Sequence, residues 1–204
     1  MRSRRQLARA LAGVVGFEEP DATLEQYATP PEVAASVVHE AALRGDLDRP
    51  VVDLGAGTGV LAIAAALGGA RTVVGLERDP AAVATAAGNA ARLGVGVNWV
   101  VGDVEALPLD PPSLVTVVAN PPFGAHLARR GADRPFLAAA ADIAAVSYTV
   151  HNAGSLDFLR AFVGDFGGEL THSYRATIDL PRQFDHHRSA THELDAVVVR
   201  IAWG

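Results

Sequence analysis

The 204-residue sequence contains no cysteine and no lysine. Without cysteine, disulfide bonds and thiolate metal ligands are excluded, and a reducing cytoplasm is the expected location. All 17 basic residues are arginines, yet the net charge is −6. This acidic balance argues against a domain that coats nucleic acid indiscriminately, but it leaves room for a local basic patch. Half of the residues are apolar, but no apolar run approaches the roughly 20 residues of a membrane span.

An alternation of strand and helix signals begins near residue 50 and predicts a parallel sheet with helices on both faces. Short apolar runs indicate strands at residues 51–54, 71–77, 95–101, 114–119, 145–150, 169–180 and 194–203. Helical spacing indicates helices at 59–67, 80–93, 135–144 and 155–166. Because no helix separates the last two strands, they are expected to pair in antiparallel fashion.

Two further helices are expected before the sheet. The first covers residues 4–15, where Leu7 and Leu11 have helical spacing. The second runs from residue 30 to about residue 43, with Thr29 as its N-cap and Pro30 in its first position. No repeat or linker interrupts the chain. One domain is therefore predicted for residues 1–204, with an N-terminal helix and pocket segment at 1–29 and the α/β core at 30–204.

The turn Asn120-Pro121-Pro122-Phe123 follows the buried strand expected at residues 114–119. Each proline fixes φ near about −65° and lacks an N–H, so the turn holds the amide of Asn120 outside the C-terminal edge of the sheet, where ligands bind. The Asn120 oxygen and the Pro121 carbonyl can each accept one hydrogen of a planar NH₂ group, while Phe123 stacks on its face. Such chemistry needs an oriented nitrogen lone pair and no titrating base. The turn alone is equally compatible with an ordinary strand-to-helix connection.

A glycine turn, Gly55-Ala56-Gly57-Thr58-Gly59, links the first expected strand to the next helix. Glycines there let the backbone approach a ligand closely. A dinucleotide-binding turn would place its third glycine where Val60 stands, and Asp53 at its mouth would repel pyrophosphate. S-adenosylmethionine (SAM) has no phosphate and carries an ammonium and a sulfonium, so an acid in that place is favourable.

Two more acids stand at the ends of the next two strands. Glu77 can receive both ribose hydroxyls of SAM, and Asp103 can accept from the adenine amino group. Each acid alone is also explained as a strand-end cap. Three acids at the ends of three successive strands, with Asp53 as the first, together favour SAM.

With these motifs the sequence resembles class I SAM-dependent methyltransferases that carry the Asn-Pro-Pro-aromatic signature of amino-group methylation. In particular, it is similar to the methyltransferase-like-five family, small-subunit rRNA adenine-N6 methyltransferases of archaea and eukaryotes. The resemblance covers essentially the whole chain and rests on further segments that match in order: Gly16-Phe17-Glu18, Leu24-Glu25-Gln26-Tyr27 with Thr29, Asn120 to Gly124, Asp133 with Phe136-Leu137, Val146-Ser147-Tyr148 with His151, and Leu180-Pro181.

The resemblance implies a Rossmann-like α/β fold, with a seven-stranded, mostly parallel sheet, an antiparallel last strand pair and helices on both faces. It implies that Asn120, Pro121, Pro122 and Phe123 form the catalytic motif. Residues and resemblance together predict cofactor contacts from Gln26, Tyr27, Thr29, Asp53, Gly55, Gly57, Gly59, Glu77, Asp103, Val104 and Asn120. Contacts with the substrate are predicted for Phe123, Gly124, Arg182, Phe184, His186 and Arg188.

The loop after Leu180-Pro181 departs from the lysine-rich pattern of the family. It contains Phe184 and several histidines, so RNA affinity is expected to be weaker or more pH-dependent than in the family. No metal site is predicted from His186, His187 and His192, because no carboxylate-supported helical pair accompanies them. A phosphate-binding rim is expected from Arg2, Arg4, Arg5, Arg129, Arg130, Arg134, Arg182 and Arg188.

The strand expected at residues 95–101 lies at the sheet edge in the usual strand order of this methyltransferase class. One of its faces is apolar, formed by Val95, Val97, Trp99 and Val101, and no charge or proline protects its open hydrogen-bonding row. Either neighbouring helices cover this strand, or another chain pairs with it. The resemblance implies the second, because family members work as heterodimers with a small zinc-binding activator subunit that adds a strand there.

The leading interpretation is SAM-dependent N6-methylation of an adenosine in small-subunit rRNA, with a flipped-out base held by the Asn-Pro-Pro-Phe motif. The alternative is a protein glutamine N5-methyltransferase acting on a release factor, which shares the Asn-Pro-Pro-aromatic geometry. Phe123, where tyrosine is the other option, and the Leu24–Tyr27 segment favour RNA. DNA adenine methylation is less favoured, because no second domain is present to read duplex sequence. A scaffold without activity is disfavoured, because all motif residues are present.

Overall fold

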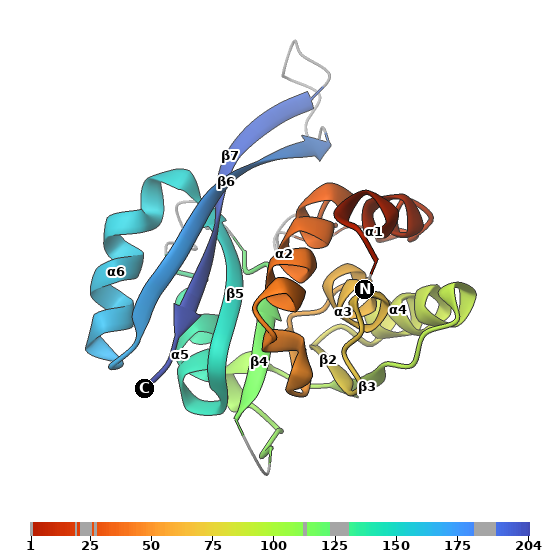
Figure 1. Cartoon of the computed structure of the whole chain (residues 1–204). Helices are drawn as coiled ribbons and strands as arrows, with labels where there is room; N and C mark the ends of the chain where they lie inside the picture. Colours follow the sequence, from red (N-terminus) through yellow and green to blue (C-terminus); the bar gives the residue numbers. More distant parts are fainter. Residues whose placement is uncertain are drawn as a thin grey trace.

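The computed structural model describes residues 2–18, 20, 26, 28–111, 114–122, 131–181 and 191–204, with only the backbone for 179–181 and 191–194. These residues form a seven-stranded sheet with the order β3-β2-β1-β4-β5-β7-β6 (Figure 1). The strands are β1 (Val51–Leu54), β2 (Val73–Glu77), β3 (Asn98–Val101), β4 (Val115–Ala119), β5 (Ala144–Asn152), β6 (Glu169–Pro181) and β7 (Thr191–Ala202). The first five strands pair in parallel, and β7 runs antiparallel to both β5 and β6. The predicted sheet is therefore confirmed.

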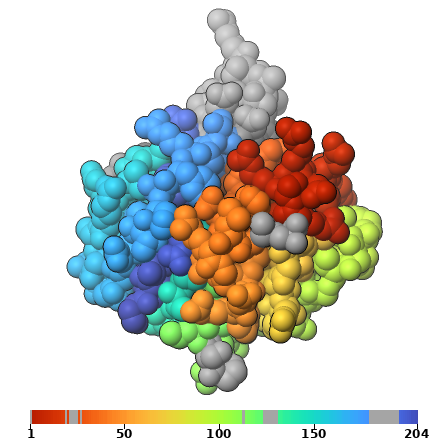
Figure 2. All heavy atoms as spheres, viewed as in Figure 1, coloured from red at the N-terminus to blue at the C-terminus, as the bar shows by residue number. Residues whose placement is uncertain are grey.

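Helices cover both faces of the sheet. They are α1 (Arg4–Leu11), α2 (Pro31–Leu43), α3 (Val60–Gly68), α4 (Pro80–Leu93), α5 (Arg134–Ile143) and α6 (Leu156–Asp165), with short 3₁₀ turns η2 (Asp46–Asp48), η3 (Val104–Ala106) and η5 (Ala153–Ser155). Within the described ranges, none of them has the length and apolarity needed to cross a bilayer. Figure 2 shows α1 and α2 side by side on the surface of one face.

Two apolar layers form the core, because successive strand side chains point to opposite faces. On β7, Val198 packs with the layer of α1, α2 and α3, whereas Val197 and Val199 pack with the layer of α5 and α6. The same alternation occurs on β1, where Val51 and Val52 belong to opposite layers. Two-sided burial explains why the central strands are nearly all apolar.

Most predicted boundaries shift by one to three residues, and three differences at the N-terminal helices and β3 have a clear physical reason. Helix α1 ends at Leu11 rather than at residue 15, and the N–H of Val15 bonds to a side chain of another helix. Strand β3 begins at Asn98, because the backbone at residues 94–95 closes the C-terminus of α4. Thr29 does not cap α2, since Pro30 occupies the N-cap position without a side-chain bond.

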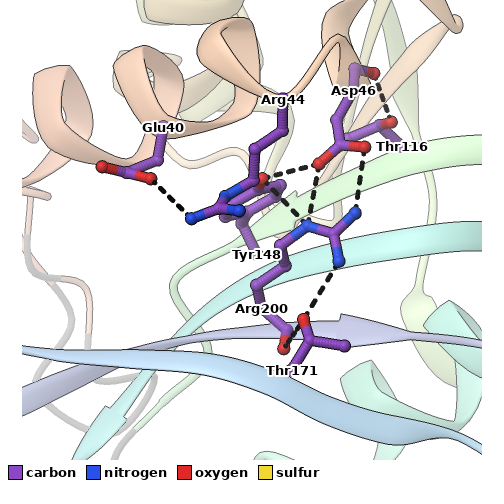
Figure 3. A network of polar contacts seen from close by, with 7 residues as sticks. All are labelled: Glu40, Arg44, Asp46, Thr116, Tyr148, Thr171 and Arg200. Carbon is purple, nitrogen blue, oxygen red and sulfur yellow. Dashed lines mark hydrogen bonds and ion pairs between the residues drawn. The ribbon is translucent and has the colours of Figure 1, made fainter.

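A buried polar network ties η2 to four strands (Figure 3). The Arg200 guanidinium on β7 donates from Nε to Oδ2 of Asp46 at 2.9 Å and from Nη2 to Oδ1 at 3.1 Å. The hydroxyl of Tyr148 on β5 donates to the same Oδ2 at 2.6 Å. Thr116 on β4 donates to the Asp46 carbonyl oxygen at 2.6 Å, and Arg200 also donates to Thr171 on β6 at 3.0 Å. The network therefore joins η2, the turn just before β1, to β4, β5, β7 and β6.

The β6–β7 hairpin extends past the end of β5. β7 pairs with β5 only from Ala196, opposite Asn152, whereas it pairs with β6 as far as Thr191, opposite Pro181. The extra length lies on the side of the carboxyl ends of the parallel strands (Figure 1). The hairpin therefore projects from the edge at which ligands bind in open α/β sheets.

Candidate active site

A cavity of about 440 Å³ lies beyond the carboxyl ends of β1, β2 and β4. Of the residues predicted from the sequence, those lining it are Gln26, Thr29, Asp53, Gly55, Gly57, Glu77, Asp103, Val104, Asn120 and Pro122. Tyr27, Phe123, Gly124, Arg182, Phe184, His186 and Arg188 lie outside the described residues. The cavity is also lined by residues to which the sequence assigned no role, among them Phe17, Thr58 and Phe136.

Three aromatic rings enclose the glycine turn at residues 55–59. A Cβ atom on Gly55, Gly57 or Gly59 would come within 2.7, 2.9 or 2.7 Å of the rings of Phe136, Phe17 and Trp99, respectively. At Gly57 the backbone also has a φ of 53°, which side-chain-bearing residues rarely adopt. The three rings come from α5, the N-terminal segment and β3, so the turn is packed by parts of the chain that are distant in sequence.

Asp53 lies one residue before the end of β1, lines the cavity and is 1% exposed. Its Oδ2 accepts from the N–H of Ala62 at 2.8 Å, whereas its Oδ1 has no partner among the described residues. Burial raises the pKa of the Asp53 carboxyl from 3.8 to about 7. The bond from Ala62 lowers this pKa in part, and the charge of Glu77 raises it further. The carboxylate is thus poised to ionise when a cation binds.

Glu77 is the last residue of β2, and Asp103 comes two residues after β3. The two carboxylate oxygens of Glu77 accept from the N–H of Gly57 at 2.9 Å and from the N–H of Asp79 at 3.0 Å, so Glu77 orients the glycine turn. Each oxygen keeps a second lone pair for a ligand hydroxyl. Asp103 caps η3 by accepting from Glu105 at 3.0 Å, which is the capping role weighed from the sequence.

Asn120 leaves β4 with its amide orientation fixed. Its Nδ2 donates to Oγ1 of Thr29 at 3.1 Å. Its Oδ1 is buried and has no partner among the residues that the structure describes. A buried acceptor without a partner costs free energy unless a donor arrives. Thr29 therefore fixes the orientation of the Asn120 amide in the structure.

Most of the residues predicted to form a partner interface at β3 pack against the core instead. β3 is an edge strand, as expected, but Val95, Val97 and Trp99 pack partly buried against the core. Trp99 lies inward, because a Cβ on Gly75 would come within 2.3 Å of its ring and one on Gly59 within 2.7 Å. Only Val101 of the four residues is well exposed, at 54%. Trp99 thus packs behind the glycine turn at residues 55–59.

A hydrogen-bonded pair, His151 and Asp133, supports the wall of the site that Phe136 forms. His151 at the end of β5 is buried; its Nδ1 lies 3.1 Å from Oδ2 of Asp133 and its Nε2 lies 2.8 Å from Oγ1 of Thr149. Asp133 stands at the N-cap position of α5, the helix that carries Phe136. The pair joins α5 to the sheet and so holds the ring against Gly55.

The family model of the methyltransferase small domain matches residues 34–146, more than half of the chain. The chain belongs to this family. Its sequence is 36% identical over 200 residues to the rRNA N(6)-adenosine-methyltransferase Mettl5 of Drosophila melanogaster, which covers 94% of this chain and 93% of that relative. A solved structure of a putative RNA methyltransferase from Pyrococcus horikoshii is similar with a TM-score of 0.89 and 35% identity, and covers 100% and 98% of the two chains.

A narrower match connects the methyltransferase with the release factor glutamine methyltransferase of Bordetella pertussis. It reaches 41% identity over 93 residues, or 43% of this chain and 34% of that protein. The expected enzyme class is confirmed: the protein is a SAM-dependent N-methyltransferase with SAM as its cofactor.

The pKa of Asp53 gives the methyltransferase a defined pH dependence. Because the folded-state pKa is raised from 3.8 to about 7, Asp53 stabilises the ligand-free fold at low pH, and this contribution is lost as the pH rises toward 7. A bound cation favours the ionised form, so SAM affinity should rise by about tenfold between about pH 6 and pH 8. Calorimetric titration at several pH values measures this slope. Asp53→Asn should remove it, and an unchanged slope in that variant would assign the pH dependence to another group.

Proposed function

We propose that this methyltransferase transfers the methyl group of SAM to N6 of an adenosine in small-subunit rRNA, with the base flipped out and held by residues 120–123. The observation that carries the proposal is the amide of Asn120. Its Nδ2 is engaged by Thr29, and its buried Oδ1 has no partner among the described residues. An exocyclic amino group is a donor that satisfies this oxygen.

In this proposal, the chain acts by orientation. SAM supplies an electrophilic methyl group on its sulfonium. Asn120 Oδ1 and the Pro121 carbonyl each accept one hydrogen of the N6 amino group, which points the nitrogen lone pair at the methyl group. Pro122 keeps the turn stiff, and Phe123 stacks on the base. The proton released from N6 after transfer leaves to solvent, so no titrating base is needed.

The cofactor contacts are proposed from the walls of the cavity. Asp53 Oδ1, which lacks a partner among the described residues, faces the SAM ammonium, Glu77 receives the ribose hydroxyls and Asp103 the adenine amino group. Gln26 and Thr29 close the side formed by the N-terminal segment, with Tyr27 between them in sequence. Residues 55–58 of the glycine turn and Val104 complete the cofactor surface, whereas Gly59, also predicted as a cofactor contact, does not line the cavity.

RNA recognition is assigned to the edge of the sheet from which the β6–β7 hairpin projects. Arg182, Phe184, His186 and Arg188 lie in sequence between its two strands, and the Drosophila relative is named for rRNA adenosine methylation. Arg134 starts α5 at the same edge, with its guanidinium 5.2 Å from the centre of the Phe158 ring. Arg2 does not belong to this rim, since it lines a different hollow beside Gly68 and Gly69 at the end of α3.

A heterodimer remains part of the proposal. The resemblance implies a small zinc-binding activator subunit that adds a strand to β3, which is an edge strand. Val101 is its exposed side chain, at 54%, whereas Trp99 supports the cofactor turn. A charge at position 101 is therefore the clean probe of the interface, and one at position 99 would also disturb the site. An rRNA acceptor is compatible with the expected cytoplasmic location.

The deciding experiment offers labelled SAM and three acceptors to the protein: protein-free small-subunit rRNA, DNA and a release factor. The protein is tested alone, with the activator, and as Val101→Asp with the activator. We expect label in rRNA adenosine, stimulation by the activator that Val101→Asp abolishes, and RNA affinity that falls with salt by a slope of roughly 0.7 per neutralised phosphate.

Label in the release factor and not in rRNA would establish the glutamine alternative. Activity in rRNA that the activator leaves unchanged would remove the heterodimer from the proposal while keeping the substrate. A Val101→Asp variant that still binds and responds to the activator would place the interface elsewhere.

A further inference from the structure

Asn89 is a fully buried polar residue on a helix whose other buried side chains are apolar. It lies on α4 at 0% exposure, and the helix also buries Ala82, Ala86 and Ala90. A side-chain amide in such a place is costly unless its donors and acceptor are all used. In the sequence, the one sign of this role is an asparagine at a core position of a helix.

The amide of Asn89 is fully hydrogen-bonded, largely by backbone from two other parts of the chain. Its Nδ2 donates to the carbonyl oxygens of Val15 at 2.9 Å and Thr58 at 2.8 Å. Its Oδ1 accepts the N–H of Val15 at 2.9 Å and a bond from Arg92. The reciprocal pair with Val15 resembles the bridge between two strands, with the side chain in place of a peptide group.

The bonds of Asn89 lie next to both partners of one contact at the cavity, the Phe17 ring and Gly57. Val15 stands two residues before Phe17, whose ring lies against Gly57, and Thr58 follows Gly57 directly. Phe17 and Thr58 both line the cavity. Asn89 therefore binds the backbone of the N-terminal segment, residues 12–18, and the backbone of the glycine turn through one amide group.

We infer that Asn89 is a positioning residue that clamps the N-terminal segment over bound SAM and so sets how slowly the cofactor leaves. The inference rests on SAM occupying the cavity and not on rRNA as the acceptor. The clamp touches neither the Asn120 amide nor its Thr29 partner. Its loss should therefore weaken SAM binding through the dissociation rate and leave the methyl-transfer step at saturating SAM almost unchanged.

Val15→Pro tests the clamp without a change in the buried helix, because proline removes the N–H that bonds to Asn89 Oδ1. Val15→Ala is the matched control, since it trims a side chain that is 45% exposed and keeps both backbone bonds. Asn89→Ala removes all the bonds at once. We expect Val15→Pro and Asn89→Ala to raise the Kd and KM for SAM by about tenfold, mainly through the dissociation rate, with kcat within about twofold. Val15→Ala should stay within about twofold in each quantity.

Hydrogen exchange of the wild-type protein gives a readout that needs no variant. The Val15 amide should exchange at least about tenfold more slowly with SAM bound, while the Val14 amide, which bonds to the Leu11 carbonyl, should change less. Equal SAM dissociation rates in Val15→Pro and Val15→Ala would overturn the clamp, and so would a Val15 amide that SAM does not protect. Binding and exchange are measured without an acceptor, so failure of rRNA methylation would leave these outcomes unaffected.

Discussion

Asn120→Ala is expected to lower kcat by roughly a hundredfold or more while the Kd for SAM changes by less than about threefold. The variant removes the oxygen that is buried, unpartnered among the described residues and oriented by Thr29. The acceptor nitrogen then keeps one positioning partner instead of two, so the lone pair is no longer held toward the methyl group. Single-turnover methylation at saturating SAM measures this step directly.

Thr29→Val is a companion variant for which a smaller fall in kcat is expected. It keeps Asn120 but removes the hydroxyl that accepts from Nδ2 at 3.1 Å, so the amide loses its fixed orientation. We expect a fall in kcat of about tenfold, smaller than for Asn120→Ala. Wild-type turnover by Asn120→Ala would refute the orientation mechanism. A loss of SAM binding equal to the loss of turnover would show that Asn120 mainly holds the cofactor.

Arg200→Ala is expected to lower the free energy of unfolding by about 3–5 kcal/mol. The substitution leaves the carboxylate of Asp46, which is 4% exposed, without its bidentate cation. Tyr148 still donates to Asp46, but one neutral hydroxyl does not compensate a buried charge. Urea denaturation followed by circular dichroism gives the difference between variant and wild type.

Arg44→Ala is the matched control for this loss. Arg44 pairs with Glu40 at 3.2 Å, but the two side chains are 35% and 37% exposed, and such pairs contribute little. Its unfolding free energy should stay within about 0.5 kcal/mol of wild type. Equal losses for Arg44→Ala and Arg200→Ala would mean that burial does not distinguish the two ion pairs.

The elements predicted most accurately are those whose two ends are marked by residue types in the local sequence. The strand at residues 51–54 and the helix at 80–93 agree with β1 and α4 at both ends. The helix has an aspartate N-cap before Pro80 and ends at Leu93 before the C-cap Gly94, and these residue types are local signals in the sequence. At Val15 helical spacing continued, but the backbone bonds to Asn89, 74 residues away, which no local pattern records.

The site was predictable where topology alone brings residues together. Asp53, Glu77 and Asn120 lie at or next to the carboxyl ends of parallel strands, and such ends meet at one edge of a sheet. The rings behind the glycine turn were not predictable, because Phe17 and Phe136 come from segments that only the folded chain brings there. Trp99 was predicted to belong to a partner interface, but the bare backbone of Gly75 on the neighbouring strand leaves room for its ring.

The ion pair of Asp46 and Arg200 joins residues that are 154 positions apart. During synthesis the aspartate emerges long before its cation exists, so the nascent chain must keep that carboxylate hydrated. The junction between η2 and β1 therefore cannot reach its final dry state until β7 has been made and has docked beside β5. Closing so long a loop is a slow, non-local event. Because β7 is translated last, its docking is the step that completes the burial of Asp46 beside β1.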